Sequence, residues 1–323
     1  MAERKKVLIS QPVHESGTAI LKPDFEVRVA PDPSVETLLK EIEDADGLLV
    51  RTAPIPREAI FAAKKLRIVA RHGVGVDNID VKAATERGIP VAYTPNANAL
   101  SVAEHVMAMM MALAKLLPRY DRATRQGNFE IRNSYRAVDL DGKTLGIVGM
   151  GRIGSLLAQK ASRAFNMKIL AYDPFLGAEK LAAMGVKPVK QLDVLLRESD
   201  FVSLHVPLTP ETRGVIGARE LGLMKPSAYL LNAARGGVVD EKALYDALSR
   251  QAIAGAGLDV FQEEPVPVTN PLLALENIIV TPHSAALTAE CVVRMATGSA
   301  QAISDALKGK RPEFVVNPEV YAR

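Results

Sequence analysis

The sequence predicts an α/β protein whose parallel β-sheets are covered by helices on both faces, and three observations lead to this fold class. Short apolar segments of strand length alternate with helical segments along most of the chain. The strand segments are continuously apolar, as expected of strands that are buried on both faces. At 323 residues, the chain is also long enough for two domains that each bury a core of their own.

The first third of the chain holds the first strand–helix series. Its predicted strands are residues 7–10, 47–50, 68–70 and 90–93. Helical patterns lie between them at residues 35–43 and 56–63. This series predicts a parallel sheet with both faces covered.

The organisation changes near residue 100, where Ser101 and Glu104 have the spacing of a capping box. The pattern predicts a long helix from Ser101 to about Leu117, ended by Pro118. A polar surface connection is expected over residues 126–142. The long helix and this connection therefore separate the first strand–helix series from a second one.

The second strand–helix series begins after the connection. Its six predicted strands are residues 145–149, 169–172, 201–204, 228–232, 256–260 and 278–281. Six strands with intervening helices are typical of a complete doubly wound, Rossmann-like sheet. The chain closes with a long helix at residues 289–308, ended by Gly309 and Pro312.

Composition and charge exclude several functional classes. The chain has 40 basic and 37 acidic residues and no long basic block, so no nucleic-acid partner is expected. The most apolar stretch, residues 106–114, is far too short to cross a bilayer, so no membrane partner is expected. Its methionines are expected to pack in a core or against another subunit, and they are Met107, Met109, Met110 and Met111.

The chain contains one cysteine, Cys291, so it cannot form an intramolecular disulfide. Together with a charged amino-terminal segment and no signal-peptide pattern, this indicates a cytoplasmic protein. Cys291 lies in a helical pattern without a nearby base in the sequence, so a buried core thiol is expected. No metal site is predicted.

A glycine-rich loop lies where a dinucleotide-binding fold requires it. Gly149, Gly151 and Gly154 follow a predicted strand and precede a helical segment. The first glycine permits a tight turn, the second lets the backbone approach a pyrophosphate, and the third lets helix and strand pack closely. Asp173 ends the next strand, where a carboxylate accepts hydrogen bonds from ribose hydroxyls and repels a 2′-phosphate. The spacing therefore predicts NAD rather than NADP.

Three reactive side chains follow strands of the same series, namely Arg235, Glu264 and His283. Ligands of open parallel sheets bind beyond the carboxyl ends of the strands. Hydride transfer from an alcohol needs a base for the hydroxyl proton, and histidine titrates nearest to neutrality. Arginine can fork onto a substrate carboxylate, and a carboxylate behind the histidine favours its charged form. Each residue alone would be a cap, a surface cation or a loop acid, but together they indicate a hydride-transfer site.

The other four histidines are weaker candidates for the proton carrier. His14, in an early loop, and His105, within the long helix, are expected to be structural. His205 ends a strand and is a candidate for lining the cofactor pocket, and His72 is a candidate contact only. This leaves His283 as the predicted proton carrier.

Six motifs spread over nearly the whole chain resemble one protein family. They lie at residues 71–79, 101–104, 146–154, 205–212, 232–237 and 258–261, the last with Glu264 and Pro265 beyond it. Taken together they are specific, and the chain resembles the D-isomer-specific 2-hydroxyacid dehydrogenases, most closely those that act on D-3-phosphoglycerate. The resemblance implies a nucleotide-binding Rossmann domain at residues 99–287, inserted into a flavodoxin-like substrate domain of residues 1–98 and 288–323.

The resemblance also implies roles for individual residues. Arg235, Glu264 and His283 form the implied catalytic set, and Asp259 would hold the nicotinamide carboxamide. The implied NAD contacts are Val74, Gly149, Gly151, Arg152, Ile153, Gly154, Asp173, His205, Val206, Pro207, Ala233, Ala234, Arg235, Asp259, His283 and Ala285. The implied substrate contacts are the backbone N–H groups of Gly73, Val74 and Gly75, the side chains of Arg235 and His283, and Arg51 for a distal anion.

Two departures from the family pattern affect these expectations. After His283 the chain reads Ser284-Ala-Ala-Leu287, a stretch in which family members often have a glycine, and this leaves the backbone contacts there open. The chain also stops at residue 323, so we expect neither a serine-sensing regulatory domain nor feedback control by serine.

The sequence leaves alternatives open for the substrate and for the functional class. Formate dehydrogenases of the superfamily have glutamine in place of Glu264, which argues against that chemistry. D-3-phosphoglycerate and 3-phosphohydroxypyruvate are the expected pair, and reduction of hydroxypyruvate or glyoxylate is the alternative. An NAD-sensing corepressor-like scaffold would carry the same three residues, but the chain has no disordered Pro/Ser-rich tail. The apolar long helix is expected to form a homodimer.

Overall fold

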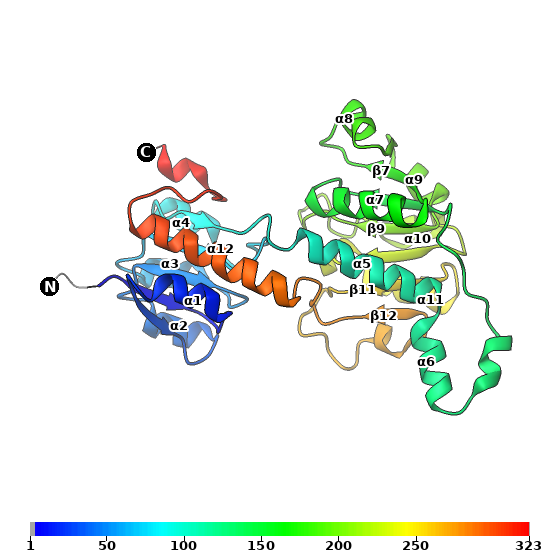
Figure 1. The fold of residues 1–323 in the computed structure, drawn as a ribbon, viewed down its shortest axis with the longest axis horizontal. Helices are drawn as coiled ribbons and strands as arrows, with labels where there is room; N and C mark the ends of the chain where they lie inside the picture. The colour runs from blue at the N-terminus through cyan, green and yellow to red at the C-terminus, as the bar shows by residue number, and fades with distance from the viewer. Residues whose placement is uncertain (1–3, 323) are drawn as a thin grey trace. The chain divides into compact units, whose positions relative to one another are not determined.

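The computed structural model describes residues 4–322 and divides into two compact units (Figure 1). Unit 1 combines Met1–Asn98 with Ala286–Arg323, and unit 2 is Ala99–Ala285. The boundary expected from the sequence, after residue 287, lies two residues beyond the end of unit 2. The extreme ends of the expected substrate domain, residues 1–3 and 323, lie outside the described residues.

Unit 1 is built around a sheet of five parallel strands in the order β2-β1-β3-β4-β5. The strands are β1 (Lys6–Ile9), β2 (Glu26–Val29), β3 (Gly47–Val50), β4 (Ile68–Arg71) and β5 (Val91–Ala92). Four of them match the apolar segments of the sequence, whereas β2 carries charged residues that hide it from that pattern. The strand order reverses between β1 and β3, which is where open parallel sheets bind ligands.

Helices cover both faces of this sheet. On one face lie α1 (Glu15–Leu21) and α12 (Ala289–Leu307), side by side although they are far apart in the sequence (Figure 1). On the other face lie α2 (Val35–Glu41), α3 (Arg57–Ala62) and α4 (Val81–Glu86). In β1, Val7 and Ile9 pack toward α12 while Leu8 packs toward the opposite face, because successive strand residues point to opposite sides. All three are fully buried, and each stabilises the unit by about 1.5–3 kcal/mol.

Unit 2 contains a sheet of seven parallel strands in the order β12-β11-β10-β9-β6-β7-β8. The strands are β6 (Thr144–Val148), β7 (Lys168–Tyr172), β8 (Lys187–Pro188), β9 (Phe201–Leu204), β10 (Tyr229–Asn232), β11 (Gly255–Leu258) and β12 (Ile278–Val280). The six strands expected from the sequence are present, and β8 adds a two-residue edge strand. The order reverses between β6 and β9. The predicted fold class, two doubly wound parallel sheets, is confirmed.

The unit 2 sheet is also covered on both faces. One face packs on α5 (Ala99–Ala114) and α7 (Arg152–Phe165), with α8 (Ala178–Ala183) toward the β7–β8 edge. The other face packs on α9 (Leu192–Glu198), α10 (Ala218–Leu223) and α11 (Glu241–Ser249). Two sheet residues that face α5 and α7, Phe201 and Tyr229, stack with their ring centroids 5.1 Å apart.

The predicted capping box at Ser101 is wrong. Helix α5 begins at Ala99, so Ser101 lies inside its first turn, and Glu104 pairs with Lys160 at 2.9 Å instead of reaching back. The helix also ends earlier than expected, at Ala114. Leu116 takes a left-handed φ of 55°, and Pro118 lies in the first turn of a separate helix, α6 (Leu117–Arg125). Proline starts this helix because the first turn needs no hydrogen bond from its nitrogen.

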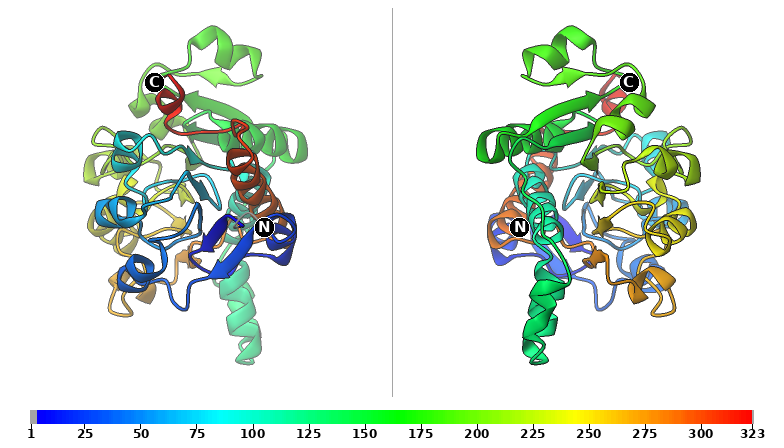
Figure 2. Two further views of the ribbon diagram at one scale, coloured as in Figure 1. Left: turned by 90° about the vertical axis from the view of Figure 1, so that its left-hand side faces the viewer. Right: turned by 90° about the vertical axis from the view of Figure 1, so that its right-hand side faces the viewer.

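Helix α6 leads into the segment that was expected to be a polar connection. The connection contains a short helical turn, η1 (Phe129–Asn133), none of whose residues is buried. Figure 2 shows α6 projecting away from the body of its own unit. No single helix of residues 4–322 is long and apolar enough to cross a bilayer, although α5 and α6 meet that test as a pair bent by 59°.

Three of the sulfur-containing residues are buried, as the sequence predicts. Cys291 is fully buried in unit 1, and Met109 and Met110 lie in the core of unit 2. Met111 remains 39% exposed on α5.

Candidate active site

The loop after β6 has the geometry that a dinucleotide needs. Gly149 has φ +94°, and a Cβ there would lie 2.7 Å from the carbonyl oxygen of His205. A Cβ on Gly154 would overlap the carbonyl oxygen of Gly149, so α7 can pack this closely only at a glycine. No atom of the described chain lies within 4 Å of a Cβ at Gly151, which precedes α7 without a side-chain cap. The first N–H groups of α7, including those of Arg152 and Ile153, are therefore open to a phosphate.

Asp173 lies beside this loop, directly after β7. Its Oδ2 accepts a hydrogen bond from the N–H of Met150 at 2.9 Å, and its Oδ1 accepts one from the N–H of Phe175 at 2.9 Å. These bonds fix the carboxylate next to the glycine loop. Each oxygen keeps lone-pair capacity for a ribose hydroxyl.

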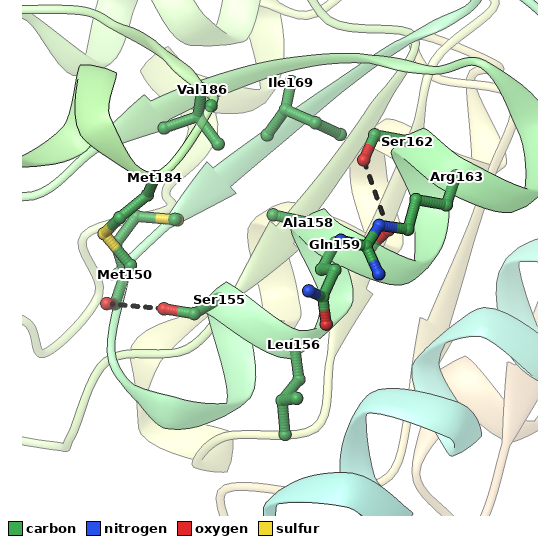
Figure 3. Close-up of a pocket in the computed structure, with 11 residues that line it drawn as sticks. Met150, Ser155, Leu156, Ala158, Gln159, Ser162, Arg163, Ile169, Met184 and Val186 are labelled. Carbon is green, nitrogen blue, oxygen red and sulfur yellow. Dashed lines mark hydrogen bonds between the residues drawn. The ribbon is translucent and has the colours of Figure 1, made fainter.

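A cavity of about 350 Å³ opens between α7 and the β7–β8 edge (Figure 3). Its polar side comes from α7, with Ser155, Gln159 and Arg163, and Ile169 and Val186 form part of its apolar side. Its lining includes none of the predicted catalytic residues. The reactive edge of the sheet is therefore elsewhere in the unit.

His205 lies at the carboxyl end of β9, next to the glycine loop at the point where the strand order reverses. Its Nε2 is 2.8 Å from the hydroxyl of the buried Ser203. Burial lowers the pKa of His205 to about 4, so the imidazole is neutral near pH 7. Val206 also contacts the loop, since a Cβ on Gly149 would lie 3.0 Å from its Cγ1. His205 and Val206 therefore lie beside the glycine loop, and the cofactor contacts predicted for them and for Pro207 stay predictions.

Arg235 follows β10 in a loop that the fully buried Asn232 holds in place. The Asn232 amide donates to the carbonyl oxygen of Arg235 at 2.9 Å, and its Oδ1 accepts from the N–H of Ala234 at 3.0 Å. The Arg235 guanidinium donates to the carbonyl oxygen of Ala234 at 2.7 Å. Asn232 therefore sets the path of residues 233–235 at the sheet edge.

Glu264 and His283 form a hydrogen-bonded pair. The Nδ1 atom of His283 lies 2.7 Å from Oε2 of Glu264, and Oε1 of Glu264 accepts from the N–H of Phe261 at 3.0 Å. Because Nδ1 faces a carboxylate, it carries a hydrogen and leaves Nε2 for a ligand. The His283 side chain is 52% exposed, so Nε2 is accessible.

Asp259 holds the turn that carries His283. The side chain is 1% exposed. Its Oδ1 accepts from the hydroxyl of Thr281 at 2.6 Å and from the N–H of Ser284 at 2.8 Å, and its Oδ2 accepts from the N–H of Ala285 at 2.9 Å. The observed task of Asp259 is thus to fix residues 281–285, and its predicted contact with the nicotinamide stays a prediction.

The loop after β4 in unit 1 carries the predicted carboxylate-binding groups. Gly73 has φ +135°, and its N–H already donates to the Thr94 hydroxyl at 3.1 Å, so Gly73 serves by its conformation and not by its N–H. Among the described residues, no acceptor faces the N–H groups of Val74 and Gly75. Arg71 braces the loop by donating to the carbonyl oxygen of Gly75 at 2.8 Å.

Arg51 and His72 lie close together at the carboxyl ends of β3 and β4. Burial, with the positive charges of Arg71 and Arg51, lowers the pKa of His72 to about 4. No carboxylate of residues 4–322 pairs with Arg51, which leaves it available to a ligand anion. His72 itself is buried, so its side chain is not placed for a direct ligand contact.

The structure brings part of the predicted site together. The glycine loop, Asp173, His205, Arg235, Glu264 and His283 all lie in unit 2, beyond the carboxyl ends of neighbouring strands, whereas Arg51 and the Gly73–Gly75 loop belong to unit 1. The sequence indicates no structural role for Asn232 or Thr281, and their signal is a polar residue at the carboxyl end of an apolar strand. No cluster of three or more potential metal ligands occurs within residues 4–322.

Comparison with known proteins decides the family. The model of the D-isomer specific 2-hydroxyacid dehydrogenase, NAD binding domain, matches residues 107–285, which is most of unit 2. A glyoxylate reductase of Korarchaeum cryptofilum is 43% identical over 324 aligned residues, covering 98% of this chain and 97% of that protein. The chain belongs to the D-isomer specific 2-hydroxyacid dehydrogenase family. The resemblance noted from the sequence motifs is confirmed.

Other members of the family show how broad the match is. A D-3-phosphoglycerate dehydrogenase of Methanocaldococcus jannaschii is 46% identical over 313 residues, which cover 97% of this chain and 59% of that relative. The chain thus spans about three-fifths of the length of the phosphoglycerate dehydrogenases that it matches. The crystal structure of D-lactate dehydrogenase from Aquifex aeolicus complexed with NAD and lactic acid has a TM-score of 0.86 and 32% identity, covering 97% of this chain and 99% of that one.

The family match makes unit 2 an NAD-binding domain, and its residues fit that cofactor. Gly149 and Gly154 have the conformation and close packing that a dinucleotide loop requires, and the start of α7 offers unpaired N–H groups to phosphate. Asp173 is fixed beside this loop, and its contact with a ribose hydroxyl stays a prediction.

Proposed function

We propose that this protein is an NAD-dependent dehydrogenase that interconverts a D-2-hydroxy acid and its 2-keto acid. The observation that carries the proposal is the pair of His283 and Glu264, 2.7 Å apart, at the sheet edge that also carries the dinucleotide loop. A carboxylate-held imidazole with an accessible Nε2 suits a proton-transfer group. The accompanying arginine, Arg235, comes from the neighbouring strand end.

The chain's residues have separate tasks in this reaction. NAD, when bound, exchanges the hydride with the substrate carbon. Arg235 binds the substrate carboxylate. In reduction, the Nε2–H of His283 gives its proton to the carbonyl oxygen as that oxygen gains negative charge, and in oxidation the neutral Nε2 takes the hydroxyl proton back. Glu264 holds the ring and stabilises its charged form.

The substrate pair is D-3-phosphoglycerate and 3-phosphohydroxypyruvate in this proposal. A phosphorylated substrate needs a cation for its distal anion, and Arg51, beside His72 in unit 1, is the predicted one. Several relatives are named D-3-phosphoglycerate dehydrogenase. The alternative is glyoxylate or hydroxypyruvate reduction, which the name of the Korarchaeum relative favours.

A comparison of rates with several 2-keto acids tests both the proposed reaction and the proposed substrate. NADH oxidation is followed with 3-phosphohydroxypyruvate, hydroxypyruvate, glyoxylate and pyruvate. The phosphorylated substrate should have the highest kcat/KM, and Arg51→Gln should lower that value by about 10–100-fold while changing glyoxylate reduction by less than about twofold, because only one substrate carries the distal anion. A preference for glyoxylate that Arg51→Gln leaves unchanged would favour the alternative. Turnover of no keto acid would contradict the dehydrogenase assignment.

A further inference from the structure

His105, in the middle of α5, reaches the turn that carries His283. Its side chain is 22% exposed, and its Nε2 lies 3.0 Å from the hydroxyl oxygen of Thr281. The carboxylate of Asp259 is farther from the same nitrogen, at 3.7 Å, so Thr281 is the direct partner. Thr281 directly follows β12, and its own N–H extends the strand ladder to the carbonyl oxygen of Leu258 at 2.9 Å.

The direction of these hydrogen bonds is set by the chemistry of the partners. The Asp259 carboxylate accepts from two backbone N–H groups, and an ionised carboxylate can only accept. The Thr281 hydroxyl, 2.6 Å from Asp259 Oδ1, therefore donates to it. That hydroxyl has no second hydrogen, so it must accept from His105, whose Nε2 carries the proton. The result is a one-directional chain from His105 through Thr281 to Asp259.

This chain ends at a strained backbone position. His283 has φ +51°, which is uncommon for a residue with a side chain. Its N–H donates to the carbonyl oxygen of Asp259 at 2.8 Å, while the Asp259 carboxylate binds the next two N–H groups. Such a conformation persists only where surrounding bonds determine it. The direction in which the His283 imidazole projects therefore depends on where Asp259 and Thr281 stand.

We propose that His105 is a positioning residue for His283. It orients the Thr281 hydroxyl, which leaves the Asp259 carboxylate in the one arrangement that binds Ser284 and Ala285, and so it holds the His283 ring at Glu264. The role of His283 as proton carrier comes from the proposed function, and this inference rests on it. His105 touches neither substrate nor cofactor in this proposal.

Matched variants separate positioning from packing. His105→Gln keeps an N–H donor at the reach of Nε2, whereas His105→Leu keeps bulk and removes the donor. Thr281→Ser keeps the hydroxyl, whereas Thr281→Val keeps the shape and removes it. The measurements are kcat and KM for the best 2-keto acid, the NADH dissociation constant by fluorescence, the melting temperature, and hydrogen exchange of the Ser284 and Ala285 amides.

Loss of the donor should act on turnover and not on binding. His105→Leu should lower kcat by about 10-fold, at the lower end of what outer-shell partners of active-site groups cost, with KM and NADH affinity within about twofold. His105→Gln should recover most of the rate. Thr281→Val should match His105→Leu, and the double variant should be little worse than either, because both break the same chain. In His105→Leu and in Thr281→Val, the Ser284 and Ala285 amides should exchange faster than in the wild type.

Other outcomes would overturn the inference. His105→Leu with wild-type kcat and wild-type amide exchange would do so, and so would equal losses in His105→Gln and His105→Leu together with a lowered melting temperature, which is the signature of packing alone. If the unaltered protein turns over no 2-keto acid, the proposed function fails. Amide exchange then decides the positioning by itself, since it needs no turnover.

Discussion

Gly236 packs directly against the backbone of Phe261, so closely that a Cβ on Gly236 would overlap the Phe261 carbonyl group. Gly236 follows Arg235, and the N–H of Phe261 binds Glu264 at 3.0 Å. This one contact therefore ties the arginine loop after β10 to the carboxylate loop after β11. At this contact the two loops cannot approach each other any further.

Gly236→Ala should disturb both loops at once. The added methyl group meets backbone, which cannot rotate away, so one loop must shift. We expect the loss in kcat/KM to be about 100-fold or more, the scale at which a displacement near 1 Å acts on a positioned group. Gly222→Ala, on the exposed side of α10 with no atom of the described chain within 4 Å of the new methyl, is the control. Steady-state kinetics that leave Gly236→Ala near wild type would contradict the coupling.

Most of the fold could be predicted from the sequence because a strand that is buried on both faces appears as a continuous run of apolar residues. The exceptions have physical reasons. The strand β2 carries Glu26 and Arg28, which break the apolar run, and β8 is too short to leave a pattern. Ser101 has the spacing of a capping residue, but spacing alone cannot show that the helix already begins at Ala99.

The sequence indicates the reactive residues of the candidate site, but it does not indicate the residues that hold their loops in place. His283, Glu264 and Arg235 stand out by type and position after strands. Asp259 was assigned a ligand contact, and its burial with three protein donors appears only in three dimensions. Asn232 acts through bonds to residues 234 and 235 that no sequence pattern specifies.

Cofactor choice should follow Asp173. Asp173→Ala removes the predicted ribose acceptor and the negative charge together, so NAD should bind more weakly. The preference for NAD over NADP should also narrow, by about 10–100-fold if one charged hydrogen bond is lost. Asp173→Asn removes the charge and keeps one acceptor oxygen, which can bind one of the N–H groups of Met150 and Phe175, so its difference from Asp173→Ala reports the part of the discrimination that needs no charge. The measurement is the ratio of dissociation constants for NADH and NADPH. An unchanged ratio in both variants would refute the assignment.

Acid should destabilise the protein through His72. Its pKa is about 4 in the folded chain and near 6.5 when unfolded. Between these values the unfolded chain binds the extra proton, so the free energy of unfolding falls as the pH drops from about 6.5 to about 4. At pH 5 this one residue accounts for a loss on the order of 2 kcal/mol relative to neutral pH.

Replacing His72 should flatten that dependence. In urea unfolding between pH 7.5 and pH 5, His72→Leu should lose less stability than wild type over the same interval. His14→Asn, at the exposed cap of α1, should keep the wild-type dependence. Parallel curves for His72→Leu and wild type would show that this imidazole does not titrate as the buried site requires.

Assembly should depend on the outer face of α5. Leu100 and Met111 are 42% and 39% exposed there, with Met107 half-buried between them. We propose that this stripe packs against a second copy, so the protein should sediment as a dimer at micromolar concentration. Met111→Glu should shift it toward monomer by placing a charge in an apolar interface. Val268→Glu, at another exposed apolar position, should not. A wild-type monomer would rule the dimer out.

Removing the proton carrier should separate catalysis from binding. His283→Gln keeps a hydrogen-bonding side chain of similar reach but cannot transfer a proton. Turnover should therefore fall by about 10²–10⁴-fold, the range usual for the loss of a positioned acid–base group. NADH affinity, measured by fluorescence titration, should change little, because the glycine loop and Asp173 lie on other strands.

The two directions of the reaction supply the control for this variant. In the wild type, keto-acid reduction uses charged His283 and should fall as the pH rises, whereas hydroxy-acid oxidation uses the neutral ring and should rise. In His283→Gln, the fall of the reduction rate and the rise of the oxidation rate with pH should both disappear, leaving residual rates that vary little with pH. Glu264→Gln removes the charge, and its single side-chain oxygen can accept from Nδ1 of His283 or from the N–H of Phe261 but not from both, so turnover should fall in both directions. More than about a tenth of wild-type turnover in His283→Gln would mean that another group carries the proton.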